Sequence, residues 1–379
     1  MDEVITISKK AKTLKKLMDI LFDFSSPTNI LPTSCVFIFH QSYVIASQLW
    51  GGAACKDRVL DLKENYHTVG LPVGATKKIW GLLSGHLDKE IIFTITDQTL
   101  GFSIGHFHGE VDLVESMGIV TPESLLGQIK ECPGQEFLAA LKSLSFCMSK
   151  NTYQPAFCGI WFVKDQNALI ASDNYRVTRY TLDEPLKGID QDFFMSAEVV
   201  EQLIRPKYKL ERLGVTSEGF VVFDFGVDVN KEEGFLVFVT GVSFLMPAHN
   251  HLLDTLNEEI DKAEIKFDFP KELLGTDLSG VALLFKDAME YSDAEISAKD
   301  GILTIIPILL QASSGKNMTI TLPLRGCPDF EKVRIHSDFL LTAIERYSRF
   351  VIVPGRCIYA YTPGTSEEHY IGWKVGSIR

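Results

Sequence analysis

Two pairs of histidines have the spacing of a simple metal site. His106 and His108 are separated by one residue, and so are His249 and His251. Side chains two residues apart lie on the same face of a strand, where two imidazoles can share one metal ion. Isolated histidines in strands are more often ordinary surface residues. We therefore expect neither a bound metal nor any other cofactor.

Two familiar catalytic motifs are missing from the sequence. It contains neither the nucleotide-binding motif G-x-x-x-x-G-K-[ST] nor the zinc-protease motif H-E-x-x-H. Gly51-Gly52, and Gly101 with Gly105, are too sparse for a loop that cradles phosphates. Asp97 and Asp173 fall at predicted turns, where an aspartate accepts hydrogen bonds from the backbone. We expect that the protein is not an enzyme, with an unrecognised enzyme as an alternative.

Lysines recur on one face of a predicted helix near the N-terminus. At 100° per residue, Lys9, Lys12 and Lys16 fall together, opposite an apolar face of Ala11, Leu14, Leu17, Met18 and Leu21. Such a face can contact phosphates without reading base sequence. It can equally be an ordinary solvated face. Further basic residues fall at the margins of this helix or in other predicted helices: Lys10, Lys15, Lys77, Lys78, Lys142, Arg205, Lys207, Lys271, Arg346 and Arg349.

The overall charge argues against a generally basic surface. The 379 residues include 37 Lys and Arg against 49 Asp and Glu, which gives a net charge of −12. Most of an acidic surface repels nucleic acid, but a local basic surface remains compatible with this total. The lysine face is therefore a prediction about where the positive charges gather.

Cysteine usage and hydropathy indicate a cytoplasmic protein. The seven cysteines form no C-x-x-C pair, which favours reduced, buried thiols over a zinc site or a disulfide framework. No apolar run approaches the roughly 20 residues that span a bilayer. Met1-Asp2-Glu3 does not begin a signal peptide. We expect a soluble protein with no membrane partner.

The elements that carry these residues follow a pattern that recurs six times. A short strand ends in Ser or Pro, a helix follows, and about three antiparallel strands come next. The junctions lie near residues 8, 72, 133, 196, 270 and 337. Breaks at 117–131 and 249–262 suggest that the units pair. The sequence thus predicts an α+β fold of three domains: 1–128, 129–258 and 259–379.

A stretch in the second predicted domain resembles the bacterial DNA polymerase III beta sliding clamp family. Residues 137–180 run from a helix through a Gly-led strand into the turn Ala171-Ser172-Asp173-Asn174-Tyr175-Arg176-Val177. This turn is similar to the family's Ala-Thr-Asp-Gly-x-Arg, with Ser for Thr and Asn for Gly. The C-terminus departs from the family, which usually ends in a Met-Pro-x-Arg-Leu-like tail. A divergent and phage-encoded member would fit.

The resemblance implies three DNA-clamp domains, each of two strand–helix–meander halves. Two chains would form a head-to-tail homodimer, a ring around double-stranded DNA with helices lining the hole. Such a clamp performs no chemistry and tethers DNA polymerase as a processivity factor. DNA polymerase and the clamp loader would bind through short peptide motifs, in the cytoplasm of a bacterium or a phage-infected host. The alternative is a clamp-fold interaction scaffold that does not encircle DNA.

The resemblance also implies two sets of site residues. Loop 148–154 matches the position of a DNA-contacting loop, and with the basic helices it gives these DNA-binding candidates: Lys9, Lys10, Lys12, Lys16, Lys77, Lys78, Lys142, Lys150, Tyr153, Arg205, Lys207 and Arg346. The candidates for a partner-peptide pocket are Ser172, Asn174, Tyr175, Arg176, Val177, Leu252, Leu253, Ile371, Trp373 and Val375. Three alternatives stay open. Trp373 can be a plain core residue, Arg176 a turn residue held by Asp173, and the loop an ordinary polar loop.

Overall fold

A computed structural model describes most of the chain. The described residues are 5–24, 34–39, 43–48, 51–56, 67–114, 130–131, 134–151, 153–205, 210, 212–215, 220–224, 234–240, 249–269, 293–308, 319–324 and 326–372. They group into two compact units. Unit 1 comprises Met1–Ser145, Gly159–Asn167 and Glu184–Phe244, and unit 2 comprises Phe146–Cys158, Ala168–Asp183 and Leu245–Arg379.

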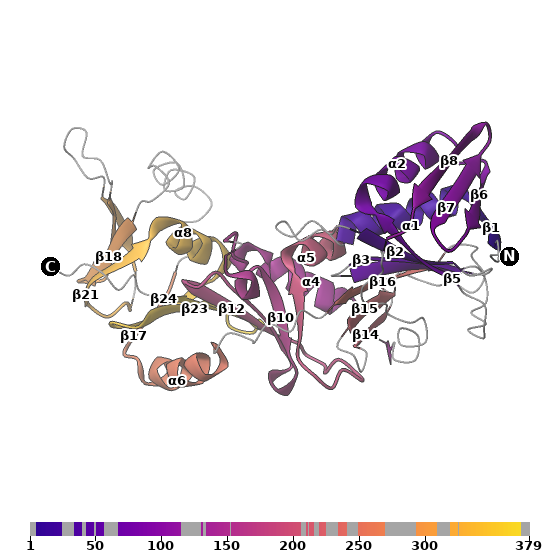
Figure 1. Ribbon diagram of the computed structural model, residues 1–379. Helices are drawn as coiled ribbons and strands as arrows, with labels where there is room; N and C mark the ends of the chain where they lie inside the picture. Colours follow the sequence, from indigo (N-terminus) through magenta and orange to yellow (C-terminus); the bar gives the residue numbers. More distant parts are fainter. Residues whose placement is uncertain are drawn as a thin grey trace, which may run out of the picture. The chain divides into compact units, whose positions relative to one another are not determined.

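The described residues of unit 1 form two antiparallel sheets, with helices packed beside them (Figure 1). The four-stranded sheet has the order β1 (Ile5–Lys10), β6 (Glu90–Ile95), β7 (Thr99–Ile104) and β8 (Phe107–Asp112). The eight-stranded sheet has the order β5 (His67–Pro72), β2 (Ser34–Phe39), β3 (Tyr43–Gln48), β4 (Gly51–Lys56), β16 (Gly234–Thr240), β15 (Phe220–Asp224), β14 (Arg212–Val215) and β9 (Lys130–Glu131). A further antiparallel pair joins β10 (Gly159–Val163) to β13 (Phe193–Ser196).

The described helices of unit 1 form a row of contacts in the order α2 (Val73–Ser84), α1 (Ala11–Phe24), α5 (Ala197–Ile204) and α4 (Gly134–Leu144). Helix α1 packs against both α2 and α5, and α5 also packs against α4. The predicted apolar face of α1 is confirmed, because Ala11, Leu14, Leu17, Met18 and Leu21 are all buried.

The first strand–helix junction differs from its prediction. Strand β1 continues through Lys9 and Lys10, and α1 begins at Ala11. The Ser8 hydroxyl, expected to cap the helix, instead donates to Glu90 Oε2 at 2.8 Å. Pairing of Lys9 and Lys10 with β6 extends the strand by two residues. The prediction for Ser196 is confirmed, since its hydroxyl accepts a hydrogen bond from the Val199 amide at the start of α5.

Unit 2 contains the strands that surround the predicted turn. One sheet has the order β11 (Ala168–Ser172), β12 (Arg176–Thr181), β24 (Glu367–Gly372), β23 (Cys357–Tyr361), β22 (Arg349–Val353) and β17 (Ile265–Asp268). A four-stranded sheet has the order β20 (Ile320–Pro323), β19 (Ile302–Ile308), β18 (Asp293–Lys299) and β21 (Phe330–His336). Apolar residues from both sheets and from helix α8 (Ser337–Arg346) form a single core.

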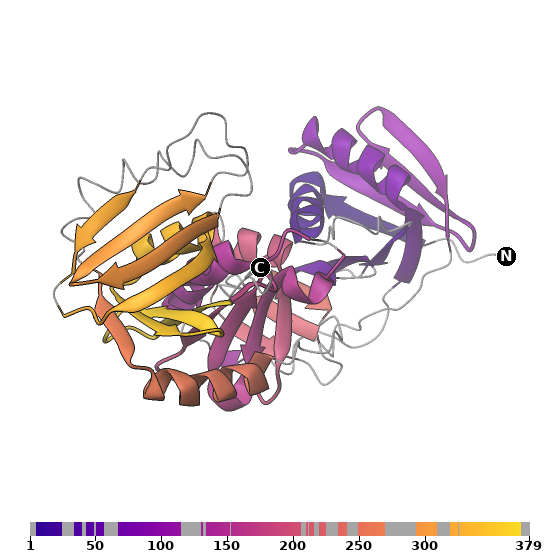
Figure 2. The same cartoon turned by 90° about the vertical axis from the view of Figure 1, so that its left-hand side faces the viewer.

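Two helices lie on opposite sides of the β12–β24 sheet (Figures 1 and 2). Helix α8 contributes Leu340, Leu341 and Ile344 to the core on one side. The other is α6 (His249–Lys262), a regular helix that packs on β22. The segment 249–262, predicted as a break, is therefore helical. The domain boundary placed in it stays a prediction. Leu253, Leu256 and Ile260 are buried at the spacing of an amphipathic helix, which explains why this segment is helical.

The three-domain division stays a prediction. Its first boundary, near residue 128, lies outside the described residues, as does the junction near 270. The second boundary, near 258, falls inside α6. Within the described ranges, no helix is long and apolar enough to span a membrane.

Candidate functional site

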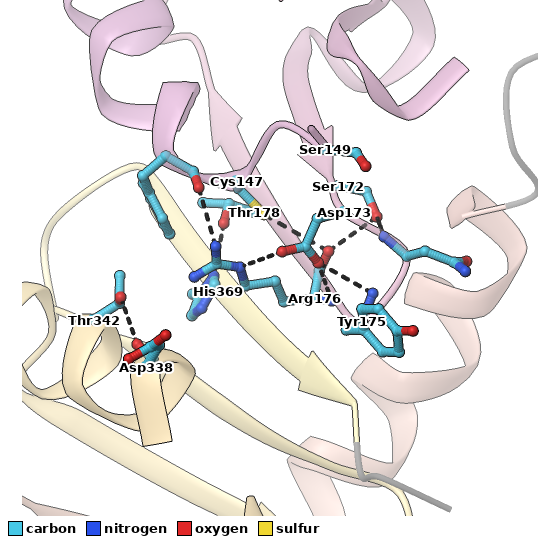
Figure 3. A network of polar contacts seen from close by, with 12 residues as sticks. Cys147, Ser149, Ser172, Asp173, Tyr175, Arg176, Thr178, Asp338, Thr342 and His369 are labelled. Carbon is cyan, nitrogen blue, oxygen red and sulfur yellow. Dashed lines mark hydrogen bonds and ion pairs between the residues drawn. The ribbon is translucent and has the colours of Figure 1, made fainter. Parts of the chain in front are cut away.

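The turn between β11 and β12 is built by the residues that the sequence singled out (Figure 3). Asp173 Oδ1 accepts from the backbone amides of Tyr175, at 3.1 Å, and Arg176, at 3.0 Å. The Ser172 hydroxyl donates to the Arg176 carbonyl at 2.9 Å. Asn174 has a φ of 76°, a left-handed conformation that asparagine tolerates better than most residues. Asn in the place of the family's Gly is thus compatible with the turn.

Arg176 is held by hydrogen bonds and by contacts with two aromatic rings. Its Nε donates to Asp173 Oδ2 at 2.8 Å, and one terminal nitrogen donates to the Phe146 carbonyl at 3.1 Å. Its guanidinium carbon lies 5.2 Å from the centre of the Phe146 ring and 4.4 Å from that of Phe339. Such cation–π contacts stabilise a shielded guanidinium. Arg176 therefore shapes the turn, as the alternative of a residue held by Asp173 anticipated.

A second arginine lies on the same aromatic ring. The guanidinium carbon of Arg346, at the end of α8, is 4.4 Å from the centre of the Phe146 ring. One of its terminal nitrogens donates to Glu367 Oε1 at 3.0 Å, and Tyr347 also donates a short hydrogen bond to this oxygen. Burial and the neighbouring carboxylate raise the pKa of Tyr347, so the phenol stays protonated. Arg346 was a DNA-binding candidate, and its guanidinium is half-buried within unit 2.

The exposed part of the turn is aromatic. Tyr175 is 64% exposed, and its ring centre lies 6.4 Å from that of the half-buried Phe339 on α8. The Gly372 amide donates to the Tyr175 carbonyl at 2.8 Å, and a Cβ at Gly372 would lie only 3.0 Å from this oxygen. Glycine thus permits β24 to hold Tyr175 in place. Tyr175 and Phe339 thus form an aromatic pair on the exposed side of the turn.

The remaining pocket candidates divide into three groups. Ser172, Val177, Leu253 and Ile371 are buried in the framework of unit 2. Leu252 lies in α6, and its side chain is outside the described residues. Trp373 and Val375 also lie outside them. Sequence reasoning missed Phe146, Phe339 and His369, because nothing in their local sequence separates them from ordinary core residues.

The basic candidates of unit 1 lie on or beside four contacting helices. Lys12, Lys77, Lys78 and Lys142 are exposed on α1, α2 and α4, Lys16 is half-buried, and Lys10 and Arg205 are exposed at element ends. Lys9 differs, because it lies in β1 and is 6% exposed. Lys15 pairs with Asp19 and lies over the Trp80 ring, which removes it from this set. Lys207 lies outside the described residues.

Hydrogen bonds hold the candidate DNA-contacting loop near Lys150 and Tyr153. Asn151 Oδ1 accepts from the Tyr153 amide at 3.2 Å, and the Asn151 carbonyl accepts from the Gln154 amide at 3.0 Å. The Ser149 amide donates to the Phe157 carbonyl at 2.8 Å. Lys150 is exposed and Tyr153 is 95% exposed. Both side chains are therefore presented to solvent on an ordered turn.

Gly101–Gly105 reads Gly-Phe-Ser-Ile-Gly, which matches the hydrolase pattern G-x-S-x-G. That pattern places a nucleophile on a sharp turn between a strand and a helix. Here Ser103 lies within β7, opposite Ile92 and His108, and a hairpin into β8 follows. The match therefore lacks its structural context. Among the residues that the structure covers, no cluster of three His, Cys, Asp or Glu side chains could hold a metal.

Comparisons with known proteins bear on the fold. No protein-family model matches the chain, and no curated protein matches it. Among solved structures, Caulobacter crescentus pol III beta has a TM-score of 0.69 at 10% identity, covering 97% of this chain and 99% of that one. A Helicobacter pylori beta clamp bound to a DNA ligase peptide has a TM-score of 0.61 at 12% identity, with the same coverage.

A Pseudomonas aeruginosa sliding clamp bound to griselimycin is a third similar structure. It has a TM-score of 0.64 at 11% identity and covers 98% of this chain and 99% of that chain. The predicted clamp fold is thereby confirmed over nearly the whole length. At such low identity, this likeness establishes the fold and leaves activity to be argued from the residues.

Proposed function

We propose that this protein is a DNA sliding clamp, which encircles duplex DNA and tethers a DNA polymerase to its template. The observation that carries the proposal is the likeness to beta clamps over 97% of this chain and 99% of the C. crescentus chain. A clamp acts by topology and by docking, so the protein is not an enzyme. The chain would thus be a divergent, phage-encoded or bacterial, cytoplasmic clamp.

The strand order supports a closed ring of two chains. Strand β4 pairs with β16 in unit 1, and β12 pairs with β24 in unit 2, both antiparallel. Strands β8 and β20 occupy the corresponding outer position of the two four-stranded sheets, where the described residues supply no neighbour. We infer that β8 of one copy pairs with β20 of another. Two such head-to-tail contacts close a ring.

The charge distribution supports an interior that accepts DNA. Exposed lysines on contacting helices of unit 1 can neutralise phosphates without reading bases. This arrangement suits a protein that must slide. The 49 Asp and Glu residues that make the whole chain negative would then disfavour DNA on the other surfaces.

The exposed aromatic turn supports docking of partner proteins. Tyr175 and Phe339 offer an apolar surface flanked by polar groups, which is the usual character of a peptide site. The similar H. pylori clamp is described as bound to a DNA ligase peptide. We infer that DNA polymerase and the clamp loader reach this chain through short peptides at the same turn.

Solution mass together with X-ray scattering tests the proposed assembly. We expect a mass of two chains and the scattering profile of a hollow particle. A compact monomer at micromolar concentration would contradict the ring. It would favour the alternative, a clamp-fold scaffold that does not encircle DNA.

A further inference from the structure

His369 belongs to the network in Figure 3, where a hydrogen bond joins it to Thr178. It belongs to β24 and stands directly opposite Thr178 of β12. The side chain is completely buried, and Nδ1 shares a 2.6 Å hydrogen bond with the Thr178 hydroxyl. The other ring nitrogen, Nε2, is buried without a hydrogen bond to any described residue. A buried polar atom without a hydrogen-bond partner costs free energy, so the presence of a histidine here calls for an explanation.

The imidazole packs against two aromatic rings that belong to the site. Its ring centre lies 5.4 Å from that of Tyr347, nearly parallel at 15°, and 5.5 Å from that of Phe146. Phe146 in turn contacts Arg176 twice, through its carbonyl at 3.1 Å and through its ring. Phe146 therefore connects His369 to Arg176, and Arg176 belongs to the turn that presents Tyr175.

The charges around His369 require a neutral imidazole. Burial comes first, followed by the positive charges of Arg176 and Arg346, and together they hold the pKa of His369 well below its ordinary value. Asp173 and Glu367 are each engaged by one of these arginines. The other titratable neighbours are the thiol of Cys147, whose pKa burial raises to about 12, and the phenol of Tyr347. A neutral ring is thus the form that packs here.

We propose that His369 is a positioning residue for the partner site: through Phe146 it fixes Arg176, and with it the turn that presents Tyr175. The imidazole packs against the Phe146 ring, and this same ring contacts the guanidinium groups of both Arg176 and Arg346. Its use in partner binding rests on the proposed function. The positioning itself is a property of unit 2 and can be measured without a partner.

Nuclear magnetic resonance of the full chain with ¹⁵N-labelled arginine measures the positioning directly. The Nε–Hε signal of Arg176 reports its bond to Asp173. The same signal of Arg179 is a matched control, because Arg179 lies on the same strand and donates from Nε to Glu368 at 2.7 Å. Substitutions of Arg176 and Arg179 by Lys assign the two signals. His369→Ala should shift or broaden the Arg176 signal and leave the Arg179 signal in place.

A rescue variant guards against a merely structural effect. Thr178→Val combined with His369→Phe replaces both hydrogen-bond partners by apolar groups of similar shape, which keeps the packing. This double variant should restore the Arg176 signal towards its wild-type position. An unchanged Arg176 signal in His369→Ala would overturn the proposal. So would loss of the Arg176 and Arg179 signals together, because that outcome indicates general disruption of the sheet.

Calorimetry with a DNA ligase peptide, the kind of ligand that the similar H. pylori clamp is described as binding, tests the link to the partner site. We expect wild type to bind, His369→Ala to bind about tenfold more weakly, and the double variant to bind nearly as wild type. A shifted Arg176 signal with unchanged affinity would overturn the link between His369 and the site. Absence of binding by wild type would count against the proposed partner site instead, while the arginine signals still decide the positioning.

Discussion

Arg176 contacts two phenyl rings and donates hydrogen bonds to Asp173 and to the Phe146 carbonyl. The side chains of Arg176 and Asp173 are only 12% and 14% exposed. Most of the charge is therefore satisfied internally, and little of it is available to an incoming ligand. At this site the arginine sets the geometry, and the neighbouring Tyr175 presents the surface.

A pair of substitutions separates these two roles. Tyr175→Ala should weaken binding of the same DNA ligase peptide with little change in stability, because the ring is 64% exposed. Arg176→Ala should weaken binding and also lower the free energy of unfolding by about 1–3 kcal/mol, since it leaves a partly buried carboxylate unpaired. Calorimetry and urea denaturation measure the two effects. Equal loss of stability in both variants would contradict the division of roles.

The neutral state of His369 gives the stability a pH dependence. An unfolded histidine takes up its proton near pH 6.5, whereas burial and two arginines hold the pKa of folded His369 well below that value. Below about pH 6.5 the unfolded chain binds a proton that the folded chain refuses. The free energy of unfolding should then fall by up to roughly 1.4 kcal/mol per pH unit, and should be insensitive to this group above pH 6.5.

Urea denaturation at pH 7.5 and at pH 5.5 measures this effect. The variant Thr178→Val/His369→Phe lacks the titrating group and should lose less stability on acidification than wild type. The carboxylates titrate alike in both proteins, so the difference isolates His369. An identical loss in the two proteins would show that His369 does not oppose protonation.

At the scale of elements, local patterns predicted interiors better than boundaries. The apolar stripe of α1 is visible in the sequence, and all five of its predicted residues are buried. The sequence predicts that the first helix begins just after Ser8, whereas α1 begins at Ala11. Ser8 bonds instead to Glu90, a residue 82 positions away. The charged residues of 249–262 favour a break in the sequence, whereas burial of Leu253, Leu256 and Ile260 makes this segment the helix α6.

The site shows the same division. The turn at residues 172–177 could be predicted because its hydrogen bonds are local. The rings that hold Arg176 could not, since Phe146 and Phe339 reach it from 30 and 163 positions away and their own neighbours give no signal. Long-range packing decides which buried aromatic residues become part of a site.

Helix α2 provides a test of the basic surface. Replacing both Lys77 and Lys78 by Glu should weaken binding to duplex DNA of any sequence. It should also lower the slope of log affinity against log salt by about 1–2 units, one for each lost phosphate contact. Fluorescence anisotropy across a salt series measures both. Lys332→Glu is the control, because Lys332 is exposed on β21 and pairs with Glu295. Equal effects at the two places would contradict a localised DNA surface.

Strand β8 provides a test of the contact between copies. Phe107 begins β8 and is 51% exposed, so Phe107→Asp should turn the dimer into a folded monomer. Ile92→Asp is a matched control on β6 of the same sheet, where the residue is 42% exposed but the strand already has two neighbours. Light scattering gives the mass of each. A dimeric Phe107→Asp variant, or a monomeric Ile92→Asp variant, would contradict pairing through β8.

At the scale of the whole molecule, total charge and local charge point in opposite directions. A net charge of −12 would place the chain among proteins that avoid nucleic acid. The structure places exposed lysines on contacting helices, whereas the exposed residues of α6 include Asp254, Glu258 and Asp261. An acidic exterior and a basic interior would direct DNA into a ring and away from its outside.

Retention on circular DNA tests the central claim most directly. Chains dissociated by dilution are concentrated in the presence of nicked circular duplex DNA, so that dimers close around it, and the complexes are then washed at high salt. The proposed clamp remains on the intact circle, because no end allows it to leave, and is lost when a restriction enzyme linearises the DNA. Equal retention on circular and linear DNA would contradict encirclement and favour ordinary surface binding.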